Sequence, residues 1–175
     1  MEQIIASCRC GAVVMEAEGP PITRGACYCA SCQEAGRRLE LLAGAPPVRQ
    51  PDGGTDCLLY RKDRVRCVER GEKLQAHRLT PVSPTRRMVA SCCNSAMFAD
   101  FTKGHWLTLY RNRMAGAVPP LQMRIMTAAR PGGTVLPQDI PNHAGYGKGM
   151  MIKLLAAWMA MGFRNPKVKG VPPAG

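Results

Sequence analysis

The sequence predicts a mainly β protein of the α+β class, and three observations support this. Short runs of strand-forming residues recur along the chain, separated by turn residues such as Arg70-Gly71, a spacing typical of antiparallel sheets. Glycine and proline are frequent, with 18 and 15 of the 175 residues, which favours many turns over long helices. Just two segments, 33–43 and about 149–163, have the pattern of helices.

The expected strands follow one another closely, and the first two flank the turn Cys8-Arg9-Cys10-Gly11. Gly11 permits the sharp backbone turn that a metal knuckle needs. In chain order, we expect strands at residues 4–6, 12–15, 55–60, 65–69, 74–79, 88–91, 96–101, 107–110 and 123–126.

The C-terminal helix is apolar on nearly all sides, so we expect it to be buried in the core or in a partner interface. Its methionines, Met150, Met151, Met159 and Met161, are interpreted as adaptable core packing. A lipid-surface role is the weaker interpretation, because the polar face is thin, and we expect no membrane partner. No segment has the length of a membrane span.

The chain length favours one domain with an appended piece. We expect residues 1–130 to form the main β domain, and 131–175 to form a C-terminal extension that packs on it. The formal charge of +12 fits nucleic acid, an anionic membrane surface or acidic small ligands as partners. Because no block of five like charges occurs, we interpret the charge as a solvated basic face.

Nine cysteines are a high and odd count. The N-terminal residues MEQIIASCRC lack both the basic region and the apolar run of a signal peptide. We therefore expect a cytoplasmic protein, in which thiols stay reduced and clustered cysteines more often bind metal than form disulfides.

Seven of these cysteines fall into three groups, and their spacing suits a metal. In extended backbone, Cys8 and Cys10 point to the same side, as do Cys27 and Cys29. Cys32 adds the usual two-residue gap of a zinc knuckle. The pair Cys92-Cys93 follows an expected strand and can complete either group. Four thiolates make a closed zinc site, whereas three leave one position open; disulfides or a buried thiol cluster are the alternatives.

The other cysteines and the histidines have simpler interpretations. Cys57 and Cys67 can face each other across a hairpin, although we favour two buried thiols. Each histidine stands alone, without a second ligand at a suitable spacing, so we expect surface or core histidines rather than metal ligands: His77, His105 and His143.

Three segments resemble the glutathione-dependent formaldehyde-activating enzyme and centromere protein V superfamily. They are Cys8-Arg9-Cys10-Gly11-Ala12-Val13, Cys27-Tyr28-Cys29-Ala30-Ser31-Cys32 and Arg87-Met88-Val89-Ala90-Ser91-Cys92-Cys93-Asn94. An uncharacterised bacterial branch with a similar Cys-Cys-Asn signature and C-terminal extension is more similar still. The resemblance covers roughly the first hundred residues.

The resemblance implies a β-tent fold of small antiparallel sheets around zinc. It also implies a structural zinc at Cys8, Cys10 and Cys93, and a catalytic zinc at Cys27, Cys29 and Cys32. The family's third segment reads Cys-x-x-Cys-Gly, but Ala90 stands at its first cysteine. Cys92 is the candidate substitute, provided that a local kink turns it toward Cys93.

These features lead to the hypothesis of a carbon–sulfur lyase of the S-(hydroxymethyl)glutathione synthase type. A substrate thiol, glutathione or another, takes the open position at the three-cysteine zinc and adds to formaldehyde or a related aldehyde. Arg24, Arg37 and Arg38 lie near this knuckle in sequence and can pair with the carboxylates of glutathione; solvated charge is their alternative role. A homodimer is possible.

The alternative function is a non-catalytic zinc module that binds nucleic acid or a protein partner. The positive charge supports it, but aromatic residues for base stacking are scarce, with three Phe, four Tyr and two Trp. A redox thiol protein is a third option, although the spacing differs from a plain Cys-x-x-Cys motif.

Overall fold

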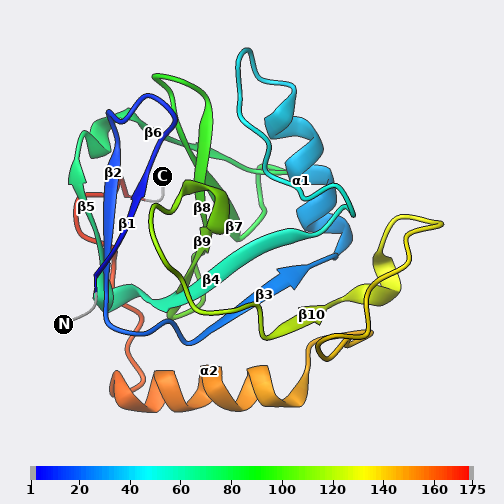
Figure 1. Cartoon of the computed structure of the whole chain (residues 1–175). Coiled ribbons are helices and arrows are strands. Elements are labelled where there is room, and N and C mark those ends of the chain that lie inside the picture. The colour runs from blue at the N-terminus through cyan, green and yellow to red at the C-terminus, as the bar shows by residue number, and fades with distance from the viewer. Residues whose placement is uncertain (1–2, 174–175) are drawn as a thin grey trace.

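Two β-sheets and two α-helices make up the protein in the computed structural model, which describes residues 3–173 (Figure 1). The smaller sheet has the order β1-β2-β5 and is antiparallel: β1 Gln3–Ser7, β2 Val14–Glu18 and β5 Val65–Glu69. The larger sheet has the order β10-β3-β4-β9-β8-β7-β6, and the β10–β3 pairing in it is parallel. Its strands are β3 Thr23–Cys27, β4 Thr55–Arg61, β6 Leu74–His77, β7 Thr85–Ala90, β8 Ser95–Phe101, β9 Trp106–Tyr110 and β10 Met123–Ile125.

The α-helices are α1 Ala30–Glu40 and α2 Lys148–Ala160. Four single turns of 3-10 helix join strands or follow them: η1 Lys62–Arg64, η2 Gly71–Lys73, η3 Arg111–Arg113 and η4 Thr127–Ala129. The α+β class predicted from the sequence is confirmed. No helix within residues 3–173 is long and apolar enough to cross a bilayer.

The main core lies between the two sheets, and it is built from alternate residues of the strands. Leu58 and Tyr60 of β4 point into it and are fully buried, together with Phe98 of β8 and Leu107 of β9. Residues of opposite parity, such as Cys57, point to the other face of the large sheet, where further apolar clusters form. Residues of α1 pack in one of those clusters, and residues of α2 pack in another.

The sequence does not predict strand β3, because only a knuckle is expected in this region, with no strand before it. The segment Thr23-Arg24-Gly25-Ala26-Cys27 has no run of strand-forming residues, so local propensity gave no signal. It is a strand because β4 and β10 pair with it on both sides. This correction matters because β3 ends on a cysteine of the second group.

Helix α1 begins at Ala30, three residues earlier than expected. Cys29 is its N-cap residue, and Cys32 lies in its first turn. The cysteine knuckle and the helix start are therefore one structural unit, since the capping sulfur stands where Ser or Asp usually accepts a backbone N–H.

Helix α2 corrects another expectation, because most of its apolar side chains are exposed. Met150 and Leu154 are buried, as is Met161 just beyond the helix, but Met151 and Met159 are exposed. The interpretation of all four methionines as core packing is wrong. The reason is that α2 covers the large sheet with only one stripe of its surface (Figure 1). It also ends earlier than expected, and Gly162 and Phe163 then have left-handed backbone.

Candidate metal centres

Four cysteine sulfurs meet between the β1–β2 turn and the β7–β8 turn. The Sγ atoms lie 3.5 Å apart for Cys8–Cys10, 3.4 Å for Cys10–Cys92, 3.8 Å for Cys8–Cys92 and 3.9 Å for Cys92–Cys93. All four lie within 4.8 Å of one another. Sulfurs placed tetrahedrally at about 2.3 Å from zinc are separated by about 3.8 Å. The four-cysteine group therefore fits a closed zinc site.

Two tight turns bring these sulfurs together. In the first, Gly11 has φ +77° and its N–H donates to the Cys8 carbonyl at 2.9 Å, while the Val13 N–H donates to Cys8 Sγ at 3.2 Å. In the second, Asn94 has left-handed backbone with φ +51°, a conformation that asparagine tolerates better than most residues. This turn directs Cys92 and Cys93 to one site, so the kink expected for Cys92 is present.

The Ser95 side chain contacts the four-cysteine group. Its buried hydroxyl lies 3.1 Å from Cys93 Sγ and accepts the Arg9 N–H at 2.9 Å. Burial raises the pKa of Cys93, but hydrogen bonds from Ser95 and from cysteine neighbours outweigh this and lower it to about 6. The pKa of Cys92 is raised to about 12, chiefly by burial. Cys93 is therefore prepared as a thiolate, the form that binds metal.

Three cysteines form a second group where β3 meets α1. Cys27 is the last residue of β3, and the Sγ atoms of Cys27, Cys29 and Cys32 lie within 4.8 Å of one another. The Cys32 N–H donates to Cys29 Sγ at 3.3 Å. Hydrogen bonds from the Cys27 and Cys32 thiols lower the pKa of Cys29 to about 2, and the bond to Cys29 raises the pKa of Cys27 to about 12. Helix dipole and backbone N–H both favour a thiolate here, so the three-cysteine group fits a zinc with one open position.

A buried arginine lies beside the three-cysteine group. Arg87 of β7, only 4% exposed, donates from Nη2 to the carbonyl and hydroxyl oxygens of Ser31, at 3.1 and 2.8 Å. Its Nη1 is buried with no hydrogen-bond partner, and no carboxylate pairs with it, among residues 3–173. Burial raises the pKa of Tyr110, the charge of Cys32 raises it further, and Arg87 opposes this. Arg87 and Tyr110 thus share the electrostatic environment of Cys32.

Tyr146 approaches the same cysteines from the C-terminal extension. Burial raises the pKa of its phenol, and the charges of Cys29, Cys27 and Cys32 raise it further. Tyr146 is 59% exposed, so its phenol is accessible to solvent. The sequence predicts neither Arg87 nor Tyr146 as a site residue, because each is separated from the knuckle by more than fifty residues. Arg87 begins the third family-like segment, but that segment points to Cys92 and Cys93 rather than to the three-cysteine group.

Residues 3–43 match the family model described as glutathione-dependent formaldehyde-activating enzyme. This segment of the chain is similar to members of that family. Among solved structures, a crystal structure of a Rhodobacter sphaeroides protein aligns with a TM-score of 0.47 at 15% identity, over 79% of this chain and 98% of that one. Comparison with curated proteins gives no match. The superfamily segment holds five clustered cysteines: Cys8, Cys10, Cys27, Cys29 and Cys32.

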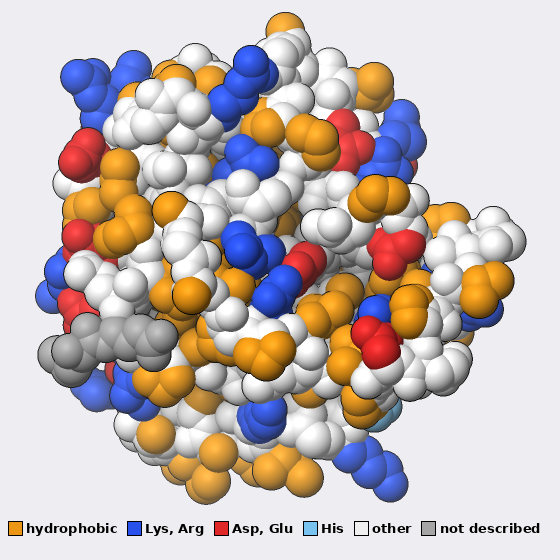
Figure 2. Space-filling model, in the orientation of Figure 1, with side chains coloured by type: hydrophobic (Ala, Val, Ile, Leu, Met, Phe, Trp, Pro, Cys, Tyr) orange, Lys and Arg blue, Asp and Glu red, His pale blue; other side chains and the backbone are white. Residues whose placement is uncertain are grey.

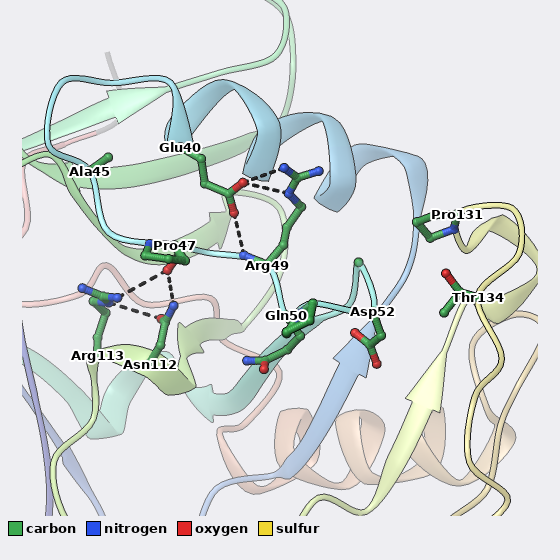
Figure 3. Close-up of a pocket in the computed structure, with 12 residues that line it drawn as sticks. Glu40, Ala45, Pro47, Arg49, Gln50, Asp52, Asn112, Arg113, Pro131 and Thr134 are labelled. Carbon is green, nitrogen blue, oxygen red and sulfur yellow. Dashed lines mark hydrogen bonds and ion pairs between the residues drawn. The ribbon is translucent and has the colours of Figure 1, made fainter.

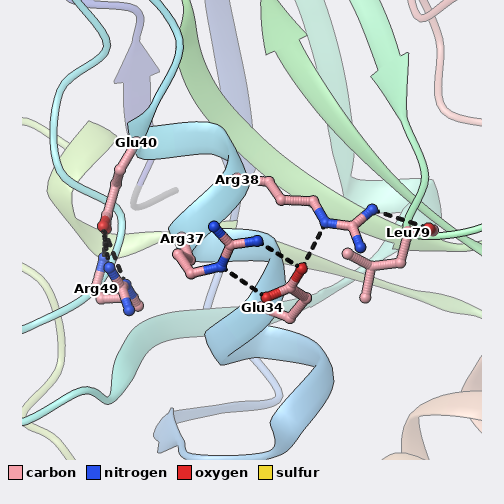
Figure 4. Close-up of polar contacts among 6 residues, drawn as sticks. All are labelled: Glu34, Arg37, Arg38, Glu40, Arg49 and Leu79. Atoms are coloured by element: carbon pink, nitrogen blue, oxygen red, sulfur yellow. Dashed lines mark hydrogen bonds and ion pairs between the residues drawn. The ribbon is translucent and has the colours of Figure 1, made fainter.

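The three arginines predicted to pair with the carboxylates of glutathione are all engaged in ion pairs within the protein. Arg24 makes two hydrogen bonds to Asp56, at 3.0 and 2.6 Å, on the face of β3 opposite Cys27. Arg37 and Arg38 pair with Glu34 on the surface of α1, at 2.9 and 2.6 Å, as Figure 4 shows. Arg37 and Arg38 follow Cys32 by about 8 to 9 Å along the helix axis.

Cys57 and Cys67 lie in different sheets, so the interpretation of a facing pair across a hairpin is wrong. Cys57 is a buried thiol that donates to the Gly25 carbonyl at 3.4 Å, as favoured from the sequence, whereas Cys67 is only half-buried. His105 is a core histidine: its Nε2 lies 2.8 Å from the Leu154 carbonyl, and its ring stacks on Trp158.

A hollow of about 810 Å³ lies beside α1, and none of the cysteines lines it. Figure 3 shows that Glu40 and Arg49 pair with each other on its wall. Asp52, also on the wall, accepts the Tyr28 hydroxyl at 2.6 Å. The charged residues on the walls of this hollow thus hold the loop after α1.

Proposed function

We propose that this protein is a zinc-dependent carbon–sulfur lyase that handles the adduct of glutathione, or another thiol, with formaldehyde or a related aldehyde. The observation that carries the proposal is the three-cysteine group, which lies in the superfamily segment and is one ligand short of a closed zinc site. Zinc bound there by three thiolates would favour the ionised, nucleophilic form of an incoming thiol.

The four-cysteine group has a different role in this proposal. Cys8, Cys10, Cys92 and Cys93 would hold a structural zinc whose binding is coupled to folding. The two sheets that meet there would then correspond to the β-tent arrangement around zinc. Ser95 and the Val13 N–H orient two of the sulfurs before metal arrives, which is the support that metal ligands usually receive from their neighbours.

The reaction needs a proton as well as a nucleophile. When a substrate thiolate attacks an aldehyde, its lone pair forms the carbon–sulfur bond and the carbonyl π electrons move to oxygen. That oxygen must then gain a proton. Tyr146 has an exposed phenol whose pKa responds to the charges of the three cysteines, and we assign it to donate from Oη; in the reverse direction the same atom takes the proton back.

The carboxylates of glutathione need cationic partners. Arg37 and Arg38 are half-exposed, with side chains 54% and 50% accessible. They can exchange Glu34 for a substrate carboxylate, because surface ion pairs are weak. Arg24 is already held bidentately by Asp56 and faces away from Cys27, so the geometry favours the α1 pair among the three arginines.

The proposal places the protein in a reducing compartment, the cytoplasm. All nine cysteines are free thiols, although the Sγ atoms of several lie less than 4 Å apart. In an oxidising compartment, such neighbours would form disulfides and lose their capacity to bind metal.

Exchange NMR on mixtures of glutathione and formaldehyde tests the activity directly. The wild-type protein is expected to accelerate formation and breakdown of the S-hydroxymethyl adduct, and Cys29→Ser is expected to abolish this. Cys67→Ser is the matched control, because it removes a partly exposed cysteine outside both groups. Two zinc ions per chain without any acceleration would favour the non-catalytic alternative.

A further inference from the structure

Helix α2 presents a continuous apolar stripe to solvent. Met151, Leu155 and Trp158 follow a spacing of four and three residues, and Ile152 and Met159 flank them on the same side. The exposed fractions are large for such side chains: 68% for Ile152, 51% for Leu155 and 52% for both methionines. Figure 2 shows hydrophobic side chains gathered along the lower edge of the molecule, where α2 lies in Figure 1.

The exposed stripe is a fixed feature, because the opposite side of the helix is anchored. Met150 and Leu154 are buried in the cluster that includes Cys27 and Ile125. The Leu154 carbonyl contacts His105 Nε2. At the edge of the stripe, the partly exposed Trp158 stacks one face on the His105 ring, with 5.6 Å between centroids. Rotation of the helix to hide the stripe would break these contacts. The stripe therefore needs a partner outside the chain if it is to be covered.

The charged residues of the C-terminal segment that carries this stripe have one sign. Residues 140–175 contain no Asp or Glu, and their five basic residues are Lys148, Lys153, Arg164, Lys167 and Lys169. None of the five takes part in an ion pair within the described part of the chain. An apolar stripe on a helix whose own charged residues, Lys148 and Lys153, are both basic is complementary to a surface that is both apolar and anionic.

We propose that α2 docks this protein onto the surface of an anionic lipid bilayer. The stripe, with Trp158 and with Phe163 just after the helix, would enter the boundary between headgroups and acyl chains, and the lysines would contact anionic headgroups. A second copy of the chain fits less well, because pairing two α2 helices would bring their lysines together without any acidic partner. Nucleic acid would satisfy the charge but leave the apolar side chains uncovered.

Vesicle co-sedimentation of the full-length zinc-loaded protein tests this proposal. Wild type is expected to bind vesicles of phosphatidylcholine with roughly one-quarter phosphatidylserine, and to bind pure phosphatidylcholine at least about tenfold more weakly. Ile152→Ser/Leu155→Ser and Lys148→Glu/Lys153→Glu should each weaken binding to the anionic vesicles by about tenfold or more. The matched control is Val82→Ser/Val135→Ser, since these valines are 90% and 91% exposed and lie outside α2.

Two results would overturn the proposal. One is absence of wild-type binding to the anionic vesicles, or equal binding to both vesicle types. The other is a dimer in light scattering that Ile152→Ser/Leu155→Ser dissociates, because a second copy would then cover the stripe. Circular dichroism and zinc content confirm that each variant is folded. The proposed lyase activity is measured separately, so failure of one proposal leaves the other intact.

Discussion

Arg87 of β7 and Ser31 of α1 are joined by two hydrogen bonds from one guanidinium nitrogen, at 3.1 and 2.8 Å. Ser31 lies between Cys29 and Cys32, so this contact fixes the first turn of α1 against the large sheet. A buried guanidinium without a carboxylate is costly. Through Ser31, Arg87 holds the turn that carries Cys29 and Cys32, which makes Arg87 a positioning residue for the three-cysteine group.

Arg87→Met should therefore weaken zinc binding at this group by about 10- to 100-fold and destabilise the protein by about 1 to 3 kcal/mol. Zinc at the four-cysteine group should remain. Chelator competition measures the two affinities, and urea denaturation measures the stability. Arg37→Met is the control, because Arg37 is an exposed arginine of α1, the helix that Arg87 contacts through Ser31. An unchanged affinity in Arg87→Met would rule out the positioning role.

Replacing Cys29 should separate capping from metal binding. Serine also accepts an N–H at an N-cap position, so Cys29→Ser should keep α1 and change the stability of the metal-free protein by less than about 1 kcal/mol. It lacks the thiolate, so zinc content should fall from two ions per chain to one. Metal analysis of protein purified without added zinc gives the count. Retention of two ions in Cys29→Ser would show that Cys29 is not a ligand.

Local sequence predicted the parts of the fold and site that depend on spacing. The groups Cys8-x-Cys10 and Cys27-x-Cys29-x-x-Cys32 each bring their sulfurs together in the structure, because a turn or a helix start fixes neighbouring residues. Residues that reach the site through sheet pairing have no characteristic spacing in the sequence that would predict them. Arg87 lies on β7, three strands away from β4 in sheet order, and its contact with α1 depends on the tertiary arrangement.

The exposed face of α2 could not be predicted from the sequence for a different reason. Its composition predicted an apolar helix, and the helix is present, but composition cannot tell how many of its sides find a neighbour. Strand β3 is the opposite case, since pairing on both edges made a strand from residues with little strand propensity.

Ser95→Ala should weaken zinc binding at the four-cysteine group, since the hydroxyl helps to keep the pKa of Cys93 near 6. Without it, Cys93 must lose a proton at neutral pH before it can bind metal, so affinity near pH 7 should fall about 10- to 100-fold. The deficit should shrink near pH 9, where the thiol ionises in both proteins. Chelator competition at the two pH values checks this. A loss of zinc affinity that is equal at the two pH values would contradict the role assigned to Ser95.

Tyr146→Phe tests the proton donor of the proposed reaction. The ring stays but Oη is removed, so kcat for adduct formation should fall by about a hundredfold. Zinc content and glutathione binding should be unchanged, because neither depends on the hydroxyl in this proposal. Steady-state kinetics measures kcat, metal analysis measures zinc content, and calorimetry measures glutathione binding. If kcat is unaltered, water rather than Tyr146 supplies the proton.

Glu40, in the last turn of α1, connects the helix to the four-cysteine group. Its carboxylate accepts the backbone N–H groups of Val48 and Arg49, at 3.0 and 2.8 Å, and two bonds from the Arg49 guanidinium. The loop held in this way presents the Ala43 carbonyl to Asn94, which follows Cys93, and the Gly44 carbonyl to Arg9. Loss of the carboxylate should therefore loosen the loop that braces both metal-binding turns.

The pH dependence of this contribution has a definite sign. Burial raises the pKa of Glu40, but the bonds from Arg49 and Val48 outweigh burial and lower it. A lowered pKa stabilises the folded protein above the unfolded value of about 4.3, and this is lost as pH falls through the folded value.

Glu40→Gln removes this titration, so wild type should exceed the variant by about 1 to 3 kcal/mol in free energy of unfolding near neutral pH. The difference should decrease below about pH 4.3. Loss of metal at acid pH affects both proteins alike, so their difference isolates Glu40. Urea denaturation at a series of pH values measures it, with Glu72→Gln as the exposed control. A difference that stays constant into the acid range would show that the Glu40 charge does not hold the loop.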